Sequence, residues 1–194
     1  MARLNTVDPT RAEGKAKTLL DAVKSKMGVV PNLTKVMANE PAVLEGYLGF
    51  AGALAGGTLP AKLKELLALE VAQANGCEYC LSAHSFLGKR AGLTEDQIVS
   101  GRKGTSEEPK TGAALAFARK LLTTRGRATD ADLKAVRDAG YTDGEIAEIV
   151  GHIALNTFTN YLNNVAETEI DFPKVPALDH HEVCEKIPGC DPTR

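Results

Sequence analysis

The stretch that decides the fold runs from Leu59 to Ile98 and reads LPAKLKELLALEVAQANGCEYCLSAHSFLGKRAGLTEDQI. Its first half, from Ala61 to about Asn75, is rich in Leu, Ala, Glu and Lys, which favour helices. Gly76 interrupts this pattern directly before Cys77, so we expect a second helix to begin at that cysteine. The stretch therefore predicts two consecutive helices, with a Cys-x-x-Cys motif at the N-terminus of the second.

The rest of the chain carries the same helical pattern. Apolar residues recur at helical spacing, and Thr, Asp or Pro residues mark the helix starts. We expect further helices at about Asp8–Met27, Leu33–Met37, Pro41–Leu54, Thr111–Thr124, Thr129–Ala139 and from Thr142 to at least Ala166. The helix that begins at Cys77 is expected to end near Ala91, and residues 100–110 are expected to form a loop. Thr94 and Gln97 have the spacing of a capping box at the start of one more short helix.

No stretch has the alternating pattern of a strand, and the sequence therefore predicts an all-α protein. We expect one domain at residues 1–171, with its core motif at 59–98. Residues 172–194, in which prolines and charged residues dominate, are expected to form an extended C-terminal tail.

Composition narrows the class of protein. The chain has 194 residues, 43% hydrophobic and 25% charged, with a net charge of -2, so no charge imbalance favours nucleic acid or an anionic membrane as a partner. Residues 1–8 lack the apolar core of a signal peptide, and no apolar run reaches transmembrane length. We therefore expect a cytoplasmic protein, where the four cysteines indicate redox or metal chemistry before structural disulfides.

The candidate site combines two thiols with an imidazole and a carboxylate. On a helix, Cys80 and His84 lie on the face that begins at Cys77, and Glu65 on the preceding helix can reach back to orient the imidazole. The positive end of the helix dipole favours a thiolate at Cys77 and, less strongly, at Cys80. Helix position also predicts Cys77 as the exposed partner for thiol exchange, whereas His84 favours deprotonation of Cys80.

Two other interpretations of these residues are open. Cys77, Cys80, His84 and either Glu65 or a water could bind zinc, although structural zinc sites usually take a second ligand pair from a separate knuckle. The cysteines could also be inert, because buried cysteine behaves as a small apolar residue. Redox chemistry accounts best for the combination of both thiols, the histidine and the glycine break.

The same residues carry a family resemblance. Leu59 to Glu65, Cys77-Glu-Tyr-Cys80-Leu-Ser-Ala-His84 and Ala91 to Ile98 resemble the carboxymuconolactone decarboxylase superfamily, in particular its AhpD-like alkylhydroperoxidase branch. Residues 156–173 are similar to the C-terminal part of the peroxidase-related members. The resemblance implies an AhpD-like helical bundle that assembles into homotrimers or homohexamers.

It also implies an activity. Cys77 and Cys80 would cycle between dithiol and disulfide to reduce hydroperoxides or a peroxiredoxin, and Cys80 would be the attacking thiol. Glu65 and His84 would form the proton relay, and an external lipoyl or thioredoxin-like dithiol would restore the pair without a bound cofactor or metal. Tyr79 stands where some members have a histidine, which makes it a candidate accessory residue. The alternative is a redox-sensing helical oligomer without turnover.

Other polar side chains have a structural interpretation. His152 is expected to be a core or interface histidine. Asn160 and Tyr161 could line a pocket beside the site, although as polar groups on the surface of the last helix they need no such role. The cysteines of the tail could form a disulfide or, with neighbouring histidines, bind a metal, although a solvated tail is expected; these residues are His180, His181, Cys184 and Cys190.

Overall fold

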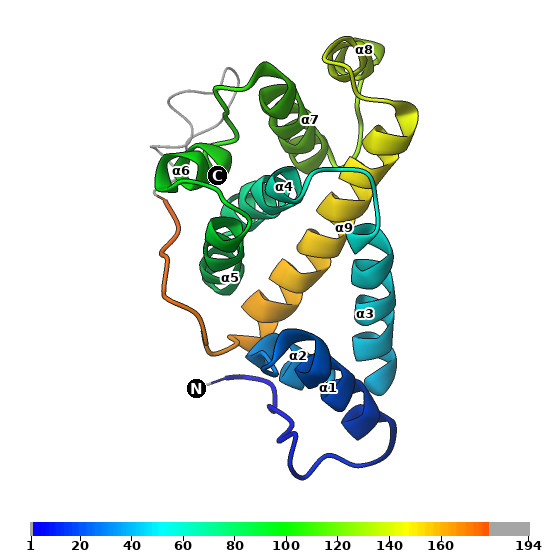
Figure 1. The fold of residues 1–194 in the computed structure, drawn as a ribbon, viewed down its shortest axis with the longest axis vertical. Coiled ribbons are helices and arrows are strands. Elements are labelled where there is room, and N and C mark those ends of the chain that lie inside the picture. Colours follow the sequence, from blue (N-terminus) through cyan, green and yellow to red (C-terminus); the bar gives the residue numbers. More distant parts are fainter. Residues whose placement is uncertain (1, 179–194) are drawn as a thin grey trace.

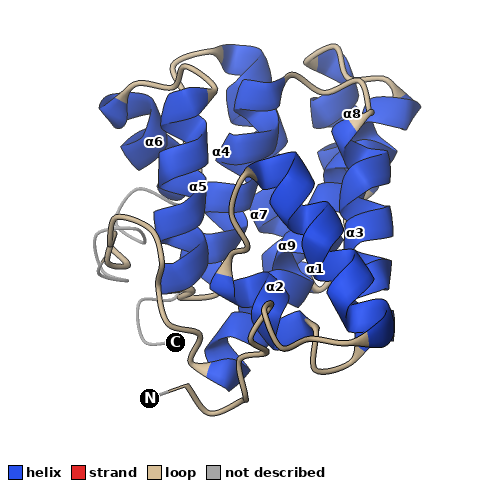
Figure 2. Cartoon of the chain, turned by 60° about the horizontal axis from the view of Figure 1, so that its bottom comes forward, coloured by secondary structure: helices blue, strands red, loops and turns tan. Residues whose placement is uncertain are grey.

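The computed structural model describes residues 2–178 of the chain, and this part is built from helices without any strand (Figure 2). The helices are α1 (Gly14–Met27), α2 (Asn32–Met37), α3 (Pro41–Ala55), α4 (Ala61–Ala74), α5 (Glu78–Arg90), α6 (Glu95–Arg102), α7 (Pro109–Thr124), α8 (Asp130–Asp138) and α9 (Asp143–Ala166). The predicted all-α class is confirmed. Within the described residues, no helix is both long and apolar enough to span a membrane.

Most predicted helix bounds agree with the structure, and two need correction. The first helix begins at Gly14 rather than near Asp8, because the Asp8 side chain accepts a hydrogen bond from the Thr10 backbone N–H and closes a turn there. The loop predicted from residue 100 begins only after Arg102, where α6 ends. Thr94 and Gln97 form the predicted capping box, with both reciprocal hydrogen bonds present.

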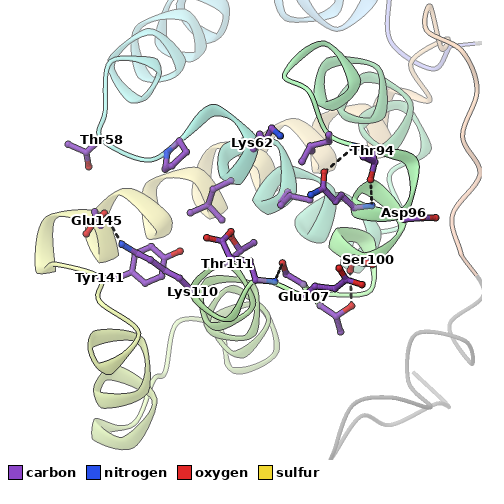
Figure 3. Close-up of a pocket in the computed structure, with 18 residues that line it drawn as sticks. Thr58, Lys62, Thr94, Asp96, Ser100, Glu107, Lys110, Thr111, Tyr141 and Glu145 are labelled. Carbon is purple, nitrogen blue, oxygen red and sulfur yellow. Dashed lines mark hydrogen bonds and ion pairs between the residues drawn. The ribbon is translucent and has the colours of Figure 1, made fainter.

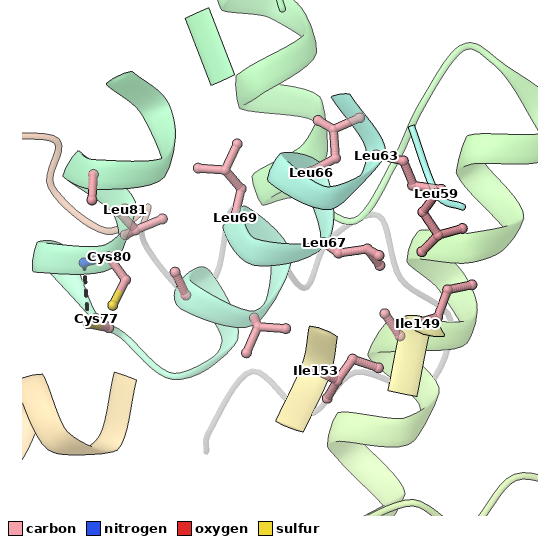
Figure 4. Packing of buried hydrophobic residues seen from close by; sticks show 14 of the residues in the cluster. Leu59, Leu63, Leu66, Leu67, Leu69, Cys77, Cys80, Leu81, Ile149 and Ile153 are labelled. Atoms are coloured by element: carbon pink, nitrogen blue, oxygen red, sulfur yellow. Dashed lines mark hydrogen bonds between the residues drawn. The ribbon is translucent and has the colours of Figure 1, made fainter. Parts of the chain in front are cut away.

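Helix α4 lies at the centre of the core and contacts α5, α6, α7 and α9 (Figure 1). A helix surrounded in this way must be apolar on nearly every side. Its second half meets that demand, because every residue from Leu66 to Gln73 is buried. Figure 4 shows the leucines of α4 packed between the cysteines of α5 and the isoleucines of α9.

The turn between α4 and α5 places the cysteines. Gly76 has a φ of 59°, in the left-handed region that favours glycine. Around it the backbone N–H of Cys77 donates to Ala72 O and that of Gly76 donates to Gln73 O, at 2.9 and 3.2 Å, which is a Schellman motif. Cys77 is thus the last residue of this motif and at the same time the N-cap of α5. The expected position of the Cys-x-x-Cys motif at a helix start is what the structure contains.

Helix α9 crosses behind the thiols as the longest helix of the described chain, with 24 residues and a length of about 36 Å. One side of it is buried but polar. The buried polar residues recur at helical spacing, and they are His152, Asn156, Thr159, Asn160 and Asn163.

Residues 172–178 run without helix along the core beside α5. The Phe172 ring packs edge-on against Tyr79, with ring centroids 5.8 Å apart. Val175 N donates to Ser82 Oγ at 2.9 Å, and Leu178 N donates to Gln73 Oε1 at 3.1 Å. This segment therefore forms part of the wall around the cysteine-bearing helix.

Candidate active site

The two thiols are adjacent, reduced and buried. The Cys77 Sγ accepts a hydrogen bond from the Cys80 backbone N–H at 3.4 Å, as a helix N-cap does, and no disulfide joins the pair (Figure 4). Cys77 has no exposed surface, and Cys80 is only 2% exposed. The expectation that Cys77 is the exposed partner is wrong, because the turn at Gly76 directs it into the core.

The surroundings favour the thiolate at Cys80 rather than at Cys77. The Cys77 thiol donates a hydrogen bond to the Cys80 sulfur, which lowers the pKa of Cys80 against the opposing effect of burial; the charge of His84 lowers it further. The same hydrogen bond, burial and the charge on Cys80 raise the pKa of Cys77. The order expected from the helix dipole alone is therefore reversed, because nearby groups outweigh it.

Two asparagines of α9 complete the environment of the Cys80 sulfur. Asn163 Nδ2 donates to the Cys80 Sγ at 3.3 Å, and the nearby Asn160 side chain also lowers the pKa of Cys80. Asn160 is fully buried and its Oδ1 accepts from Asn75 Nδ2 at 3.0 Å. Amide N–H groups that face a sulfur stabilise its negative charge. Asn160 is thus a buried neighbour of the thiols rather than the surface residue expected, whereas Tyr161 is exposed.

The predicted carboxylate–imidazole pair is formed between α4 and α5. His84 Nδ1 lies 2.8 Å from Glu65 Oε2. Burial disfavours the charged imidazole, but the Glu65 carboxylate and the Cys80 sulfur outweigh it and raise the pKa of His84. The site therefore favours an imidazolium beside a thiolate, with Glu65 holding the ring.

A cavity of about 250 Å³ opens onto this arrangement. Cys80, His84 and Glu65 line it, whereas Cys77 does not. Much of the rest of the wall is apolar and includes Leu33, Tyr47, Ala51, Leu87, Leu155 and Phe172. A ligand with an apolar body can thus reach the Cys80 sulfur, which is the accessible atom of the pair.

His152 also lines this cavity from α9. It is buried, as expected of a core histidine, and its Nε2 lies 3.7 Å from Glu148 Oε1 without a hydrogen-bond partner. Burial and the charge of Lys64 lower the pKa of His152. The cavity wall therefore contains a second imidazole, which stays neutral.

Tyr79 is turned toward α2. Its hydroxyl accepts a hydrogen bond from the Leu33 backbone N–H at 3.2 Å, and its ring forms part of the cavity wall. Burial, opposed by that hydrogen bond and assisted by the nearby Asp171 carboxylate, raises the pKa of Tyr79. The phenol therefore shapes the cavity and is poorly suited to release a proton.

The zinc interpretation finds no geometric support. Among residues 2–178, no three His, Cys, Asp or Glu side chains are grouped so that they could hold a metal ion. Glu65 is engaged with His84, and Cys77 faces the core rather than the cavity. His180, His181, Cys184 and Cys190 lie outside the described residues.

A larger cavity, of about 690 Å³, lies between the N-terminal ends of α4, α6, α7 and α9 (Figure 3). None of its lining residues is Cys or His. Lys110 lies 3.8 Å from Glu145 and 4.6 Å from the centroid of the Tyr141 ring, so its charge already has partners. Its lining has carboxylates, lysines and hydroxyl groups but neither a thiol nor an imidazole, and the candidate active site is therefore the smaller cavity.

Sequence reasoning missed the contribution of Asn163 and the position of His152 in the wall. The available signal was the polar side chains at helical spacing between residues 152 and 163, where the pattern of a core helix calls for apolar residues. Buried polar residues at such spacing indicate a functional surface or a polar network.

Comparisons with known proteins agree with this architecture. Residues 41–122 match the model of the carboxymuconolactone decarboxylase family. The chain is also 35% identical over 68 residues to uncharacterized protein 4 in the cox locus of Paracoccus denitrificans. The match spans 60% of the length of that relative.

Solved structures with the same fold cover most of the chain. An AhpD-core, peroxidase-related protein from Ralstonia eutropha JMP134 superposes with a TM-score of 0.78 at 23% identity, covering 88% of this chain and 92% of its own. The debrominase Bmp8, in complex with 2,3,4-tribromopyrrole, superposes with a TM-score of 0.74 at 21% identity. This match covers 87% of the present chain and 91% of Bmp8. A peroxidase-related protein from Silicibacter sp. TM1040 superposes with a TM-score of 0.73 at 20% identity. This match covers 87% of the present chain and 94% of the Silicibacter protein. The chain is thus similar to the carboxymuconolactone decarboxylase family over residues 41–122, and its helices adopt the AhpD-like fold.

Proposed function

We propose that this protein is a thiol-dependent peroxidase that reduces organic hydroperoxides with a Cys77–Cys80 dithiol. One observation carries the proposal: the Cys80 sulfur, whose pKa is lowered, lines a cavity together with the Glu65–His84 pair, while the Cys77 thiol lies behind it. A thiolate, a proton donor and a resolving thiol are the three parts that such a cycle needs.

In the first step, the Cys80 thiolate attacks the terminal oxygen of the hydroperoxide. The O–O bond breaks, the sulfur becomes a sulfenic acid, and the alkoxide takes a proton from the His84 imidazolium and leaves as the alcohol. Glu65 stabilises the imidazolium before this transfer and keeps its ring in place.

In the second step, the Cys77 thiol attacks the Cys80 sulfenic acid, and the Cys77–Cys80 disulfide forms as water leaves. An external dithiol then reduces the disulfide by thiol exchange. Because Cys77 is fully buried, the incoming thiolate must attack the Cys80 sulfur through the cavity. Such access favours a slender lipoyl-type dithiol as the reductant, because a folded thioredoxin or peroxiredoxin would have to approach with its surface. The cycle would operate in a reducing compartment such as the cytoplasm.

The test is catalytic turnover. With dihydrolipoamide as the reductant and cumene hydroperoxide as the substrate, we expect many equivalents of hydroperoxide to be consumed per protein, with one dihydrolipoamide oxidised to lipoamide for each. Consumption of a single equivalent of hydroperoxide, followed by a stable Cys77–Cys80 disulfide, would instead identify the redox-sensing alternative.

We also propose that the protein is a homo-oligomer, a trimer or hexamer, that buries the face formed by α3 and α9. Helix α3 is almost entirely apolar, yet Leu44 is its only buried residue. Exposed large apolar side chains continue from α3 onto the neighbouring α9, and they are Val43, Phe50, Val150, Phe158, Tyr161 and Val165. Exposed apolar side chains gathered on two neighbouring helices are typical of a protein interface.

A charge placed in this face should break the oligomer. We expect Phe158→Glu to lower the mass measured by sedimentation equilibrium to that of a smaller species, because a carboxylate buried in an apolar contact costs several kcal/mol, about 3 or more. Ala135→Glu, on the exposed side of α8, is the matched control and should keep the wild-type mass. A wild-type protein that sediments as a monomer at micromolar concentration would disprove the assembly.

A further inference from the structure

Two histidines line the active-site cavity, and each has a glutamate beside it. Glu65 and His84 form the first pair, in direct hydrogen-bond contact. Glu148 and His152, one turn apart on α9, form the second, with the His152 ring in the cavity wall. The proposed thiol cycle uses only the first pair, so the second imidazole has no role in it.

Glu148 is held firmly in its ionised form. The Thr58 backbone N–H and hydroxyl donate to Glu148 Oε2 at 2.7 and 3.0 Å, and Leu59 N donates at 3.2 Å. Lys64 Nζ lies 3.3 Å away from its Oε1. Gly57 leaves the space for this carboxylate, since a Cβ there would lie 2.2 Å from Oε1. These contacts fix Glu148 beside Lys64 and His152, which both line the cavity.

The fixed carboxylate sets the tautomer of His152. The proton of a neutral imidazole is expected on the nitrogen that faces a carboxylate, which here is Nε2. Nδ1 is then a hydrogen-bond acceptor. The charged groups around the ring are Glu148 on its own helix and Lys64 and Glu65 on α4, and the balance of burial and Lys64 keeps the ring uncharged. His84, by contrast, is a proton donor.

We propose that His152 is the residue that binds the hydroperoxide O–H group, accepting its hydrogen at Nδ1 and directing the terminal oxygen at the Cys80 sulfur. The inference rests on the proposed hydroperoxide reduction and adds its recognition step. His152 holds the oxygen that bears the hydrogen, and His84 protonates the oxygen that leaves. A hydroperoxide differs from an ether or a dialkyl peroxide in this hydrogen, so the neutral acceptor also provides selectivity.

The experiment compares His152→Met with His152→Gln, two unbranched side chains of similar size of which only Gln carries a strong acceptor. Two rates are measured on the reduced protein. One is the second-order oxidation of Cys80 by cumene hydroperoxide in a single turnover, and the other is alkylation of Cys80 by iodoacetamide. We expect His152→Met to slow the oxidation about tenfold, because one hydrogen bond to the hydroperoxide is lost. The rate of alkylation should stay within about twofold of the wild-type rate. His152→Gln should recover most of the oxidation rate.

The other outcomes are distinct. Equal rates of oxidation in the wild type and in His152→Met overturn the inference alone, as does a parallel loss of oxidation and alkylation, which shows a packing role. If His152→Met does not fold, a tenfold slower oxidation in His152→Gln than in the wild type, with unchanged alkylation, also overturns it. A wild-type protein that is alkylated but inert to hydroperoxide overturns the proposed function, and the inference with it.

Discussion

Cys80→Ser is expected to abolish hydroperoxide turnover, with a loss of activity on the order of a thousandfold or more, because it removes the nucleophile. Cys80 lines the cavity and its sulfur receives hydrogen bonds from Asn163 and Cys77. The variant should also lose the rapid alkylation by iodoacetamide, whose rate in the wild type should titrate with a midpoint below the ordinary thiol value of about 8.5. Hydroperoxide consumption and alkylation as functions of pH are the two measurements.

Cys77→Ser is the matched control because it changes the same atom in the neighbouring residue. We expect this variant to react once with hydroperoxide and to stop at a Cys80 sulfenic acid, which dimedone labels, since no resolving thiol remains. Its alkylation midpoint should stay below the ordinary thiol value, because the serine hydroxyl also donates a hydrogen bond and can replace the Cys77 thiol as the donor to the Cys80 sulfur. If the two variants both keep full turnover, the dithiol mechanism is wrong.

Arg119→Met is expected to destabilise the fold by about 3 kcal/mol at pH 8, the cost of leaving a buried charge without its partner. Glu70 is fully buried in the middle of α4, and its Oε1 accepts from Arg119 Nε at 2.5 Å. Its Oε2 has no hydrogen-bond partner. Burial, opposed by Arg119, raises the pKa of Glu70 from 4.5 to about 7.

The pH dependence of this loss follows from that shift. Between pH 4.5 and about 7 the folded state binds more protons than the unfolded state, so the free energy of unfolding falls as pH rises through this window. Without Arg119 the pKa of Glu70 rises further, so the pH range over which the free energy of unfolding falls extends to higher pH. Urea unfolding should therefore show a smaller destabilisation at pH 5 than at pH 8.

The double variant Glu70→Met/Arg119→Met is the control, because it removes both charges and keeps the volume of the pair. We expect it to recover most of the lost stability, since apolar replacement of a buried ion pair is often neutral. Equal losses in the single and double variants would show that Arg119 stabilises the core by packing rather than by its charge.

The helices and the place of the thiols could be predicted from the sequence because their causes are local. Glycine at position 76 requires the left-handed turn, and Thr94 with Gln97 caps a helix through neighbours in the chain. Even the Glu65–His84 contact follows from two consecutive helices that pack against each other. The family resemblance of these residues was confirmed by the match at residues 41–122.

The relative acidity of the cysteines stayed open in the sequence, because two local arguments pointed in opposite directions. The helix dipole favoured a thiolate at Cys77, whereas the spacing of His84 favoured deprotonation of Cys80. The observed order depends on Asn163, which is 83 positions from Cys80 in the chain, and on the complete burial of Cys77 in the core. His152 was likewise assigned to the core, since no local pattern distinguishes a histidine that faces a cavity from one that only fills space.

The polar contacts around the Cys80 sulfur also bear on the reduction potential of the dithiol. Asn163 and His84 stabilise a negative sulfur, and a sulfur in a disulfide carries no such charge. These contacts therefore lower the free energy of the reduced protein relative to that of the disulfide form. Each tenfold stabilisation of the reduced form raises the reduction potential of the dithiol–disulfide couple by about 30 mV. Hydroperoxides are strong enough oxidants to overcome this stabilisation. The oxidised protein then accepts electrons readily, so the contacts that create the nucleophile also drive its regeneration.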